Sequence, residues 1–127
     1  MRLLLDTHVF LWFVAGDARL SRRARRALED EDNDIFLSAA SVWEMAIKTS
    51  LGRLTLPTSV ARYTEDKLRH GLQMLPIDWP HAAGVEDLPW HHSDPFDRLL
   101  IAQARIEGFS VVTGDAAFRP YGVTIVW

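Results

Sequence analysis

The chain has 127 residues, a formal net charge of −3 at pH 7 and no cysteine. This length is typical of one domain, expected over residues 1–127, and 48% hydrophobic residues are too many for a disordered chain. The lack of cysteine excludes disulfide frameworks and thiolate zinc sites, and the acidic balance excludes nucleic-acid binding by bulk charge alone. We therefore expect a globular, cytoplasmic protein.

Apolar runs and helix signals alternate along the sequence. Residues 2–6 (RLLLD) form a short apolar run that ends in a carboxylate, typical of a buried strand. The N-terminal stretch MRLLLDTHVFLWFVAG is interrupted by Asp6 and His8 and is too short to span a bilayer, so we expect a buried strand followed by a helix. Ser21 is the expected N-cap of a helix over residues 20–30, and a second strand is expected over 34–39. The remaining expected elements are a helix stopped by Gly52, a helix over 59–70, a strand over 72–77, a short helix capped by Asp78, a helix from Pro95 to Gly108, and strands over 109–115 and 122–127.

This alternation predicts an α/β fold with a central, mainly parallel sheet flanked by helices on both faces. In such sheets, ligands bind beyond the carboxyl ends of the strands. Asp6 ends the first strand, and Asp115 follows the fourth. Glu44 lies about one turn into the helix after the second strand, and Asp97 lies in the first turn of the helix that Pro95 opens. The sequence therefore predicts that four carboxylates converge on one edge of the sheet.

Three of these acids also have simpler explanations. Asp97 suits a helix N-terminus without any ligand, and Asp94 is a near alternative that helical spacing does not separate from it. A single Glu usually lies on a solvated helix face, but the neighbours of Glu44 over residues 42–47 are almost wholly apolar, so a buried Glu with a partner is expected. Asp115 follows Thr-Gly and fits a turn or an N-cap.

Bringing the acids close together costs electrostatic free energy. Carboxylates about 4 Å apart repel one another by several kcal/mol at an effective dielectric constant of about 20, so the cluster needs a cation. Ligation by oxygen alone, without cysteine and without an H-x-x-x-H pair, favours Mg²⁺ or Mn²⁺ over zinc. Such an ion suits phosphate substrates, and the reaction that this implies is phosphodiester hydrolysis.

Four segments of the chain also resemble the PIN domain, specifically the VapC-type toxins of bacterial toxin–antitoxin pairs. They are LLLDTHVFLW at 3–12, SAASVWEMAIKTSLGRLTLP at 38–57, HHSDPFDRLLIAQA at 91–104 and VVTGD at 111–115. The resemblance implies a single PIN-like domain and a ribonuclease with an Mg²⁺ or Mn²⁺ site. It implies Asp6 and Asp97 as direct ligands, and Glu44 as a ligand or as the group that positions the attacking water. Asp115 would act through metal-bound water, and Asp97 is preferred to Asp94 because LLIAQA follows it.

The resemblance also implies partners: an RNA substrate, a cognate antitoxin whose tail covers the active site, and a second copy in a homodimer, with no membrane partner. Trp12 and Phe13 are candidates for the antitoxin or dimer contact. The basic run RRARR at 22–26 would supply phosphate contacts if it faced the acidic edge, and is otherwise a solvated helix face.

Other polar residues near these segments have smaller expected roles. His91 and His92 would contact RNA or transfer protons, or are bystanders of the loop. For Arg98, an ion pair with a nearby acid is preferred to a phosphate contact. The hydroxyl groups that would orient carboxylates, or else satisfy strand and helix ends, belong to Thr7, Ser38, Ser41 and Thr113.

Other protein classes share parts of this pattern. A phosphoacceptor signalling domain needs paired acids after the first strand and a late lysine, whereas this chain has only Asp6 there and no lysine after Lys67. A haloacid-dehalogenase-like phosphatase needs Asp-x-Asp at the same place, where position 8 is His. A third alternative is a catalytically silent binding module with the same fold, and only an activity assay can distinguish it from a ribonuclease.

Overall fold

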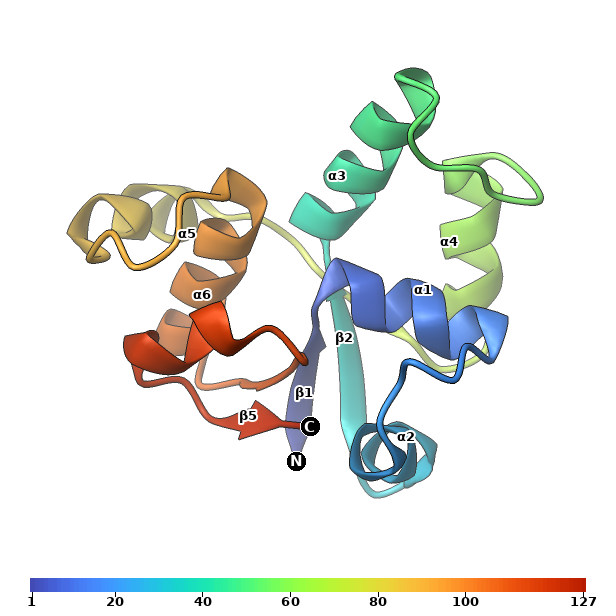
Figure 1. Ribbon diagram of the computed structural model, residues 1–127, viewed down its shortest axis with the longest axis horizontal. Coiled ribbons are helices and arrows are strands. Elements are labelled where there is room, and N and C mark those ends of the chain that lie inside the picture. The colour runs from blue at the N-terminus through green and yellow to red at the C-terminus, as the bar shows by residue number, and fades with distance from the viewer.

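The computed structural model describes residues 1–127 and contains one five-stranded sheet in which every strand pairing is parallel (Figure 1). The expected α/β fold is therefore confirmed, and the sheet is wholly rather than mainly parallel. The last three strands are shorter than predicted. The strands are β1 (Arg2–Leu5), β2 (Asp34–Ser38), β3 (Gln73–Leu75), β4 (Ser110–Val112) and β5 (Ile125–Val126).

Helices connect the strands in the predicted order. Ser21 caps its helix as expected, since its side chain accepts a hydrogen bond from the Ala24 N–H, 3.1 Å away. Gly108 ends the last long helix in the left-handed conformation (φ 75°), which glycine adopts without strain. No helix combines the length and the apolar character needed to cross a membrane. The helices are α1 (Thr7–Ala15), α2 (Arg22–Glu29), α3 (Ala39–Ser50), α4 (Val60–Leu68), α5 (Trp79–Gly84) and α6 (Pro95–Glu107), with 3₁₀ turns η1 (Val85–Asp87) and η2 (Ala116–Tyr121).

Apolar side chains cover both faces of the sheet, as expected for parallel strands. Leu3 and Leu5 of β1 point into a cluster with residues of α1 and α2, whereas Leu4 points into a second cluster with residues of α6 and η2. Figure 1 shows the corresponding arrangement, with α5 and α6 on one side of β1 and β2 and α1 and α4 on the other. The two clusters hold the sheet between two helical layers.

The strand order places a topological switch point beside β1. The order is β3-β2-β1-β4-β5, so the chain moves outward from β1 in one direction and later returns to add β4 and β5 on the other side. Leu4 of β1 is paired with Phe36 on one side and with Val111 on the other. Such a reversal opens a crevice at the carboxyl ends of the strands, where ligands bind. Asp6 lies at this point, and its N–H donates to the Val112 carbonyl oxygen at 3.1 Å.

Candidate metal centre

Asp6 lies between β1 and the first residue of α1 and is only 6% exposed. Its carboxylate does not cap the helix but accepts a hydrogen bond at Oδ2 from the Thr113 hydroxyl, 2.9 Å away. Nδ1 of His8 lies 4.0 Å from the other oxygen, Oδ1. Burial raises the pKa of Asp6 above its usual value of 3.8, and the Glu44 carboxylate adds to that rise. The fold therefore holds a carboxylate whose charge it compensates poorly.

Glu44 lies on α3 and is 4% exposed. Lys48, one turn later on the same helix, places its Nζ 2.6 Å from Oε2 of Glu44. The other oxygen, Oε1, is buried and has no hydrogen-bond partner. The expected buried glutamate with a partner is present, and one of its oxygens is left available to a ligand.

Asp97 and Asp94 both lie at the start of α6, but their carboxylates make hydrogen bonds to different groups. The Asp94 carboxylate is the N-cap and accepts from the Asp97 N–H at 3.0 Å. The Asp97 carboxylate instead meets Nε2 of His92, 2.7 Å from Oδ2. Burial, followed by the nearby charge of Asp6, raises the pKa of Asp97 to about 7. The capping role therefore belongs to Asp94, and Asp97 faces the other acids.

Asp115 joins the same edge from the loop after β4. Its Oδ1 caps η2 by accepting from the Ala117 N–H at 2.9 Å, and its Oδ2 lies 3.8 Å from Nε2 of His92. Its side chain is 42% exposed, far more than those of the other acids. Asp115 is thus an N-cap, as its simpler explanation held, and also a wall of the acidic site.

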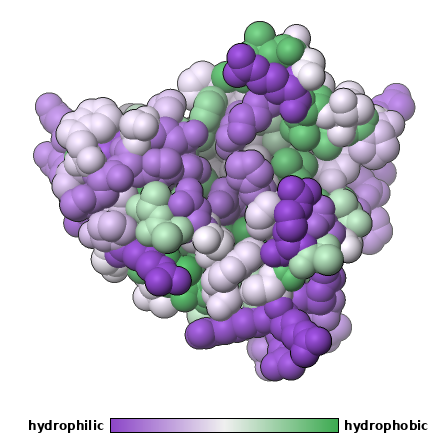
Figure 2. Space-filling model, in the orientation of Figure 1, coloured by the Kyte–Doolittle hydropathy of each residue, from purple (hydrophilic) through white to green (hydrophobic).

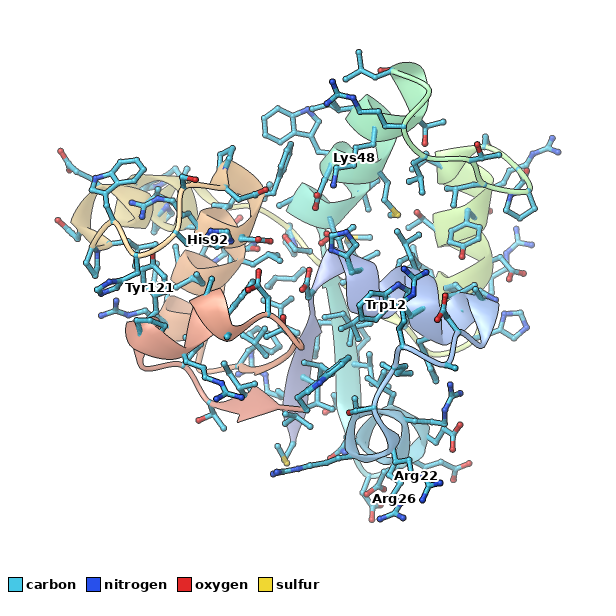
Figure 3. All side chains as sticks on the ribbon, viewed as in Figure 1. Trp12, Arg22, Arg26, Lys48, His92 and Tyr121 are labelled. Carbon is cyan, nitrogen blue, oxygen red and sulfur yellow. The ribbon has the colours of Figure 1, made fainter.

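The four predicted acids therefore meet at the C-terminal edge of the sheet. Figure 3 shows the labelled His92 and Lys48 on opposite sides of the end of β1, with carboxylate oxygens between them. Hydrophilic side chains gather across the middle of this face, between α6 and α1 (Figure 2). The acids come from four segments that are distant in the sequence, and only the parallel sheet brings them together.

Comparison with known proteins agrees with this arrangement. The PIN domain family matches residues 3–123 of the chain. Ribonuclease VapC22 from Mycobacterium tuberculosis is 33% identical over 119 residues, which cover 93% of this chain and 90% of that protein. The chain belongs to the PIN-domain family. Two solved structures resemble this PIN domain in fold: VapBC2 from Rickettsia felis bound to a promoter DNA fragment (TM-score 0.73, 15% identity, 98% of this chain and 97% of that one) and FitAcB from Neisseria gonorrhoeae (TM-score 0.66, 22% identity, 97% and 95%).

The donor set of this PIN domain fits a hard divalent cation. Asp6, Glu44 and Asp97 are carboxylates that lie in a largely buried environment, and the raised pKa values of Asp6 and Asp97 show that their negative charge is disfavoured without a cation. Oε1 of Glu44 is a buried acceptor with no partner, which costs free energy unless a ligand occupies it. Divalent cations bound at this edge would compensate these charges.

One of the four candidate hydroxyl groups contacts a predicted acid, and the other three bind elsewhere. Of the hydroxyl groups expected to orient carboxylates, that of Thr113 binds Asp6. The Thr7 hydroxyl donates to Ser41, 2.8 Å away, and the Ser38 side chain donates to Gln103 and caps α3. Thr113 also accepts from the Asp115 N–H, so one hydroxyl joins two of the acidic segments.

The expected ion pair of Arg98 with an acid is wrong. Arg98 is 2% exposed and its guanidinium donates to the Tyr121 hydroxyl and to four backbone carbonyl oxygens of residues 85–92. The ring of Trp90 lies over it, 3.8 Å from the guanidinium carbon to the ring centroid. Arg98 therefore anchors the loop before α6, and it faces neither a phosphate site nor an acid.

The basic run at 22–26 forms α2, which lies near the beginning of β1 rather than at its end, with Arg22 and Arg26 pointing away from the sheet (Figures 1 and 3). This helix does not face the acidic edge, so the structure agrees with the alternative prediction, a solvated helix face. Lys48 and His8 also lie beside the acids, which was not expected from the sequence. The contact of Lys48 could have been predicted, because side chains four residues apart on a helix, such as Glu44 and Lys48, lie on the same face.

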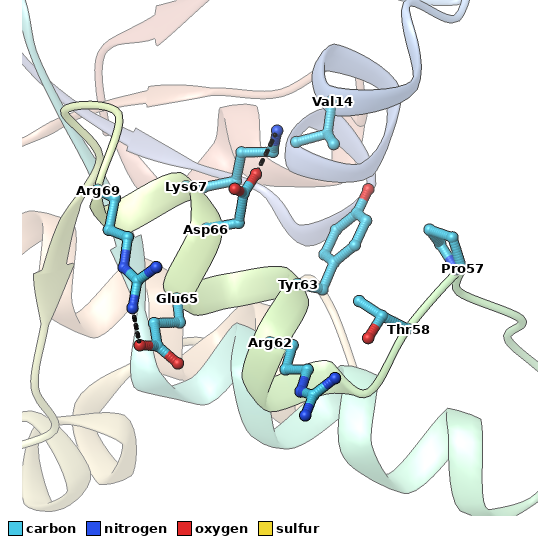
Figure 4. A pocket seen from close by; sticks show the side chains of 9 residues that line it. All are labelled: Val14, Pro57, Thr58, Arg62, Tyr63, Glu65, Asp66, Lys67 and Arg69. Carbon is cyan, nitrogen blue, oxygen red and sulfur yellow. Dashed lines mark hydrogen bonds and ion pairs between the residues drawn. The ribbon is translucent and has the colours of Figure 1, made fainter.

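A cavity of about 570 Å³ lies elsewhere, between the end of α1 and α4 (Figure 4). Four of its five charged side chains pair, Asp66 with Lys67 at 3.1 Å and Glu65 with Arg69 at 2.8 Å, and the fifth, Arg62, is exposed. Because both acids of this cavity are paired, it lacks the buried, unpartnered carboxylate oxygen that distinguishes the acidic site.

Proposed function

We propose that this chain, as a single PIN domain, is a divalent-metal-dependent endoribonuclease and the toxin of a toxin–antitoxin pair. The observation that carries the proposal is the cluster of acids at the switch point of a chain that is 33% identical to Ribonuclease VapC22, with Asp6 and Glu44 buried and Oε1 of Glu44 without a partner. Asp6, Glu44, Asp97 and Asp115 would hold Mg²⁺ or Mn²⁺. The chemistry supplied by such an ion is a lower pKa for water and neutralisation of charge at the scissile phosphate.

The residues around the metal would act by holding the acids in place. Thr113 donates to Oδ2 of Asp6, which fixes that carboxylate at the end of β1. Lys48 holds Oε2 of Glu44, and the unpartnered Oε1 would be free to bind the metal or to position the attacking water. Without the metal, the acidic edge would repel the phosphates of RNA, so substrate binding would depend on the ion.

Cleavage of RNA by the purified chain tests the proposal. We expect a mixed RNA pool to be cut with Mg²⁺ or Mn²⁺ and not with EDTA. Asp6→Asn and Asp97→Asn should each lower the rate by at least about 100-fold, because each removes a charge that holds the metal. Asp94→Asn is the matched control, since asparagine caps a helix as well as aspartate and should leave the rate within about threefold.

Equal cutting by wild type and the acid variants would mark the activity as a contaminant and end the proposal. If none of them cuts although metal binds, a silent binding module replaces the enzyme as the proposed function.

We further propose a protein antitoxin and a homodimer as partners. The solved structures with this fold include a toxin–antitoxin complex from Klebsiella pneumoniae, which supports the first. Trp12 and Phe13 of α1 are only partly buried and are the proposed contact residues. Light scattering should give twice the chain mass of 14.5 kDa for the dimer. A monomer mass at all concentrations would exclude it.

A further inference from the structure

His92 lies in the loop before α6, and its neighbours fix both its backbone and its ring. Its N–H donates to the Tyr121 hydroxyl at 2.8 Å, and its carbonyl oxygen accepts from Arg98 at 3.3 Å. Its ring lies beside Phe118, with 6.2 Å between the ring centroids, and its side chain is only 19% exposed. The preceding His91 is exposed and stacks edge-on against Tyr121. The fold therefore directs the ring of His92, and not that of His91, toward the acids.

Nε2 of His92 points between two carboxylates that come from different elements. It lies 2.7 Å from Oδ2 of Asp97 and 3.8 Å from Oδ2 of Asp115. One donor atom from each of these three residues lies within 4.8 Å of the other two. Neighbouring ligands of an octahedral ion are about 3 Å apart when the bonds are about 2.1 Å long. The separations of 2.7 and 3.8 Å lie on either side of this value, so the three side chains need only small shifts to share one ion.

We propose that Nε2 of His92 is a metal ligand, together with Asp97 and Asp115, and that this nitrogen makes the site select Mn²⁺ over Mg²⁺. The inference rests on the proposed function, because it needs a divalent metal at the acidic edge. Mg²⁺ prefers an all-oxygen environment, whereas imidazole nitrogen binds transition-metal ions better. Oxygen ligands alone would not produce such a preference.

Two other arrangements of His92 and His8 around the metal predict a different nitrogen ligand or none. In one, His92 only donates a hydrogen bond that orients Asp97, and no nitrogen touches the metal. In the other, the nitrogen ligand is His8, whose Nδ1 lies 4.0 Å from Oδ1 of Asp6 on a side chain that is 59% exposed. A measurement that detects the nitrogen directly separates all three.

Pulsed electron paramagnetic resonance of Mn²⁺ bound to the full chain is that measurement. We expect a histidine-nitrogen coupling in wild type, which changes from ¹⁴N to ¹⁵N when histidine is isotopically labelled. The coupling should persist in His8→Gln and vanish in His92→Gln. No coupling in wild type, or loss in His8→Gln with retention in His92→Gln, would overturn the proposal. If His92→Gln fails to fold, the labelled His8→Gln keeps it testable, because loss of the coupling there would overturn the proposal.

Calorimetric titration supplies the second readout. His92→Gln should raise the Kd for Mn²⁺ by about tenfold or more and the Kd for Mg²⁺ by less than about threefold. His70→Gln, exposed after α4, is the matched control and should change neither. An equal loss of affinity for both ions would assign His92 an orienting role and overturn the proposal. Mn²⁺ binding without nitrogen coupling defeats this inference alone, whereas a wild type that binds neither ion defeats the proposed function as well.

Discussion

Arg98 and Glu44 are both buried charged residues near the same edge of the sheet, but the fold treats them differently. The Arg98 guanidinium makes five hydrogen bonds to oxygen atoms, whereas Glu44 has one partner for two oxygens. Buried polar groups in folded proteins are normally satisfied, and those left incomplete need an explanation. A buried charged group with all its hydrogen bonds made is therefore structural, whereas one with an unpartnered atom is available to a ligand.

Removal of the structural charge should have the largest effect on stability. Arg98→Met leaves four carbonyl oxygens of the 85–92 loop without their donor, so we expect the free energy of unfolding to fall by about 4 kcal/mol. Urea denaturation measures this change. Arg105→Met, exposed on the same helix, is the control and should change stability by less than about 0.5 kcal/mol. A loss below about 1 kcal/mol for Arg98→Met would contradict the structural role.

Removal of a ligand charge should instead stabilise the metal-free protein. The pKa of Asp97 is raised from 3.8 to about 7, so between these values the native state keeps a proton that the unfolded chain has lost. The free energy of unfolding therefore falls as pH rises through this window. Asn cannot ionise, so in EDTA at pH 8 we expect Asp97→Asn to be more stable than wild type by about 2 kcal/mol.

The gain of Asp97→Asn should disappear near pH 4, where wild type also carries the proton. Urea denaturation at both pH values checks this, with Asp66→Asn, an exposed acid on α4, as the control without a gain. A variant less stable than wild type at pH 8 would show that the acidic site is satisfied without metal.

Thr113 connects the two kinds of region, because its hydroxyl completes hydrogen bonds for Asp6 and for the Asp115 N–H. Thr113→Val keeps the shape and removes both bonds, so we expect a loss of about 1 to 2 kcal/mol in the free energy of unfolding. Thr55→Val, which is exposed, should have little effect. An unchanged stability for Thr113→Val would mean that water replaces the hydroxyl at this edge.

Asp94 is expected to give the smallest change. Asp94→Ala removes the N-cap of α6 and should cost about 1 kcal/mol, while Asp94→Asn should cost almost nothing. Thermal unfolding of the two variants, side by side, measures the difference. If both variants lost RNA cleavage as completely as Asp97→Asn, Asp94 would belong to the metal site after all.

The acidic edge could be predicted from the sequence because parallel strands end together, and Asp6 and Asp115 each follow a strand. The burial of Glu44 followed from its apolar neighbours. The partners of Arg98 could not be predicted, because backbone carbonyl groups of an irregular loop leave no pattern in side-chain identity. The position of His92 depends on the same loop, and it was visible only as a histidine five residues before Asp97.

The hydrogen bond between Thr113 and Asp6 joins residues 107 positions apart, and it bears on the timing of synthesis. At about 5 to 20 residues per second, Asp6 waits roughly 5 to 20 seconds after its own synthesis before Thr113 is added. During this time β1 lacks its neighbour β4, and the centre that would cut RNA is not assembled. A nascent chain of this fold therefore lacks the complete acidic centre until Thr113 has been added, while the ribosome is the RNA nearest to it.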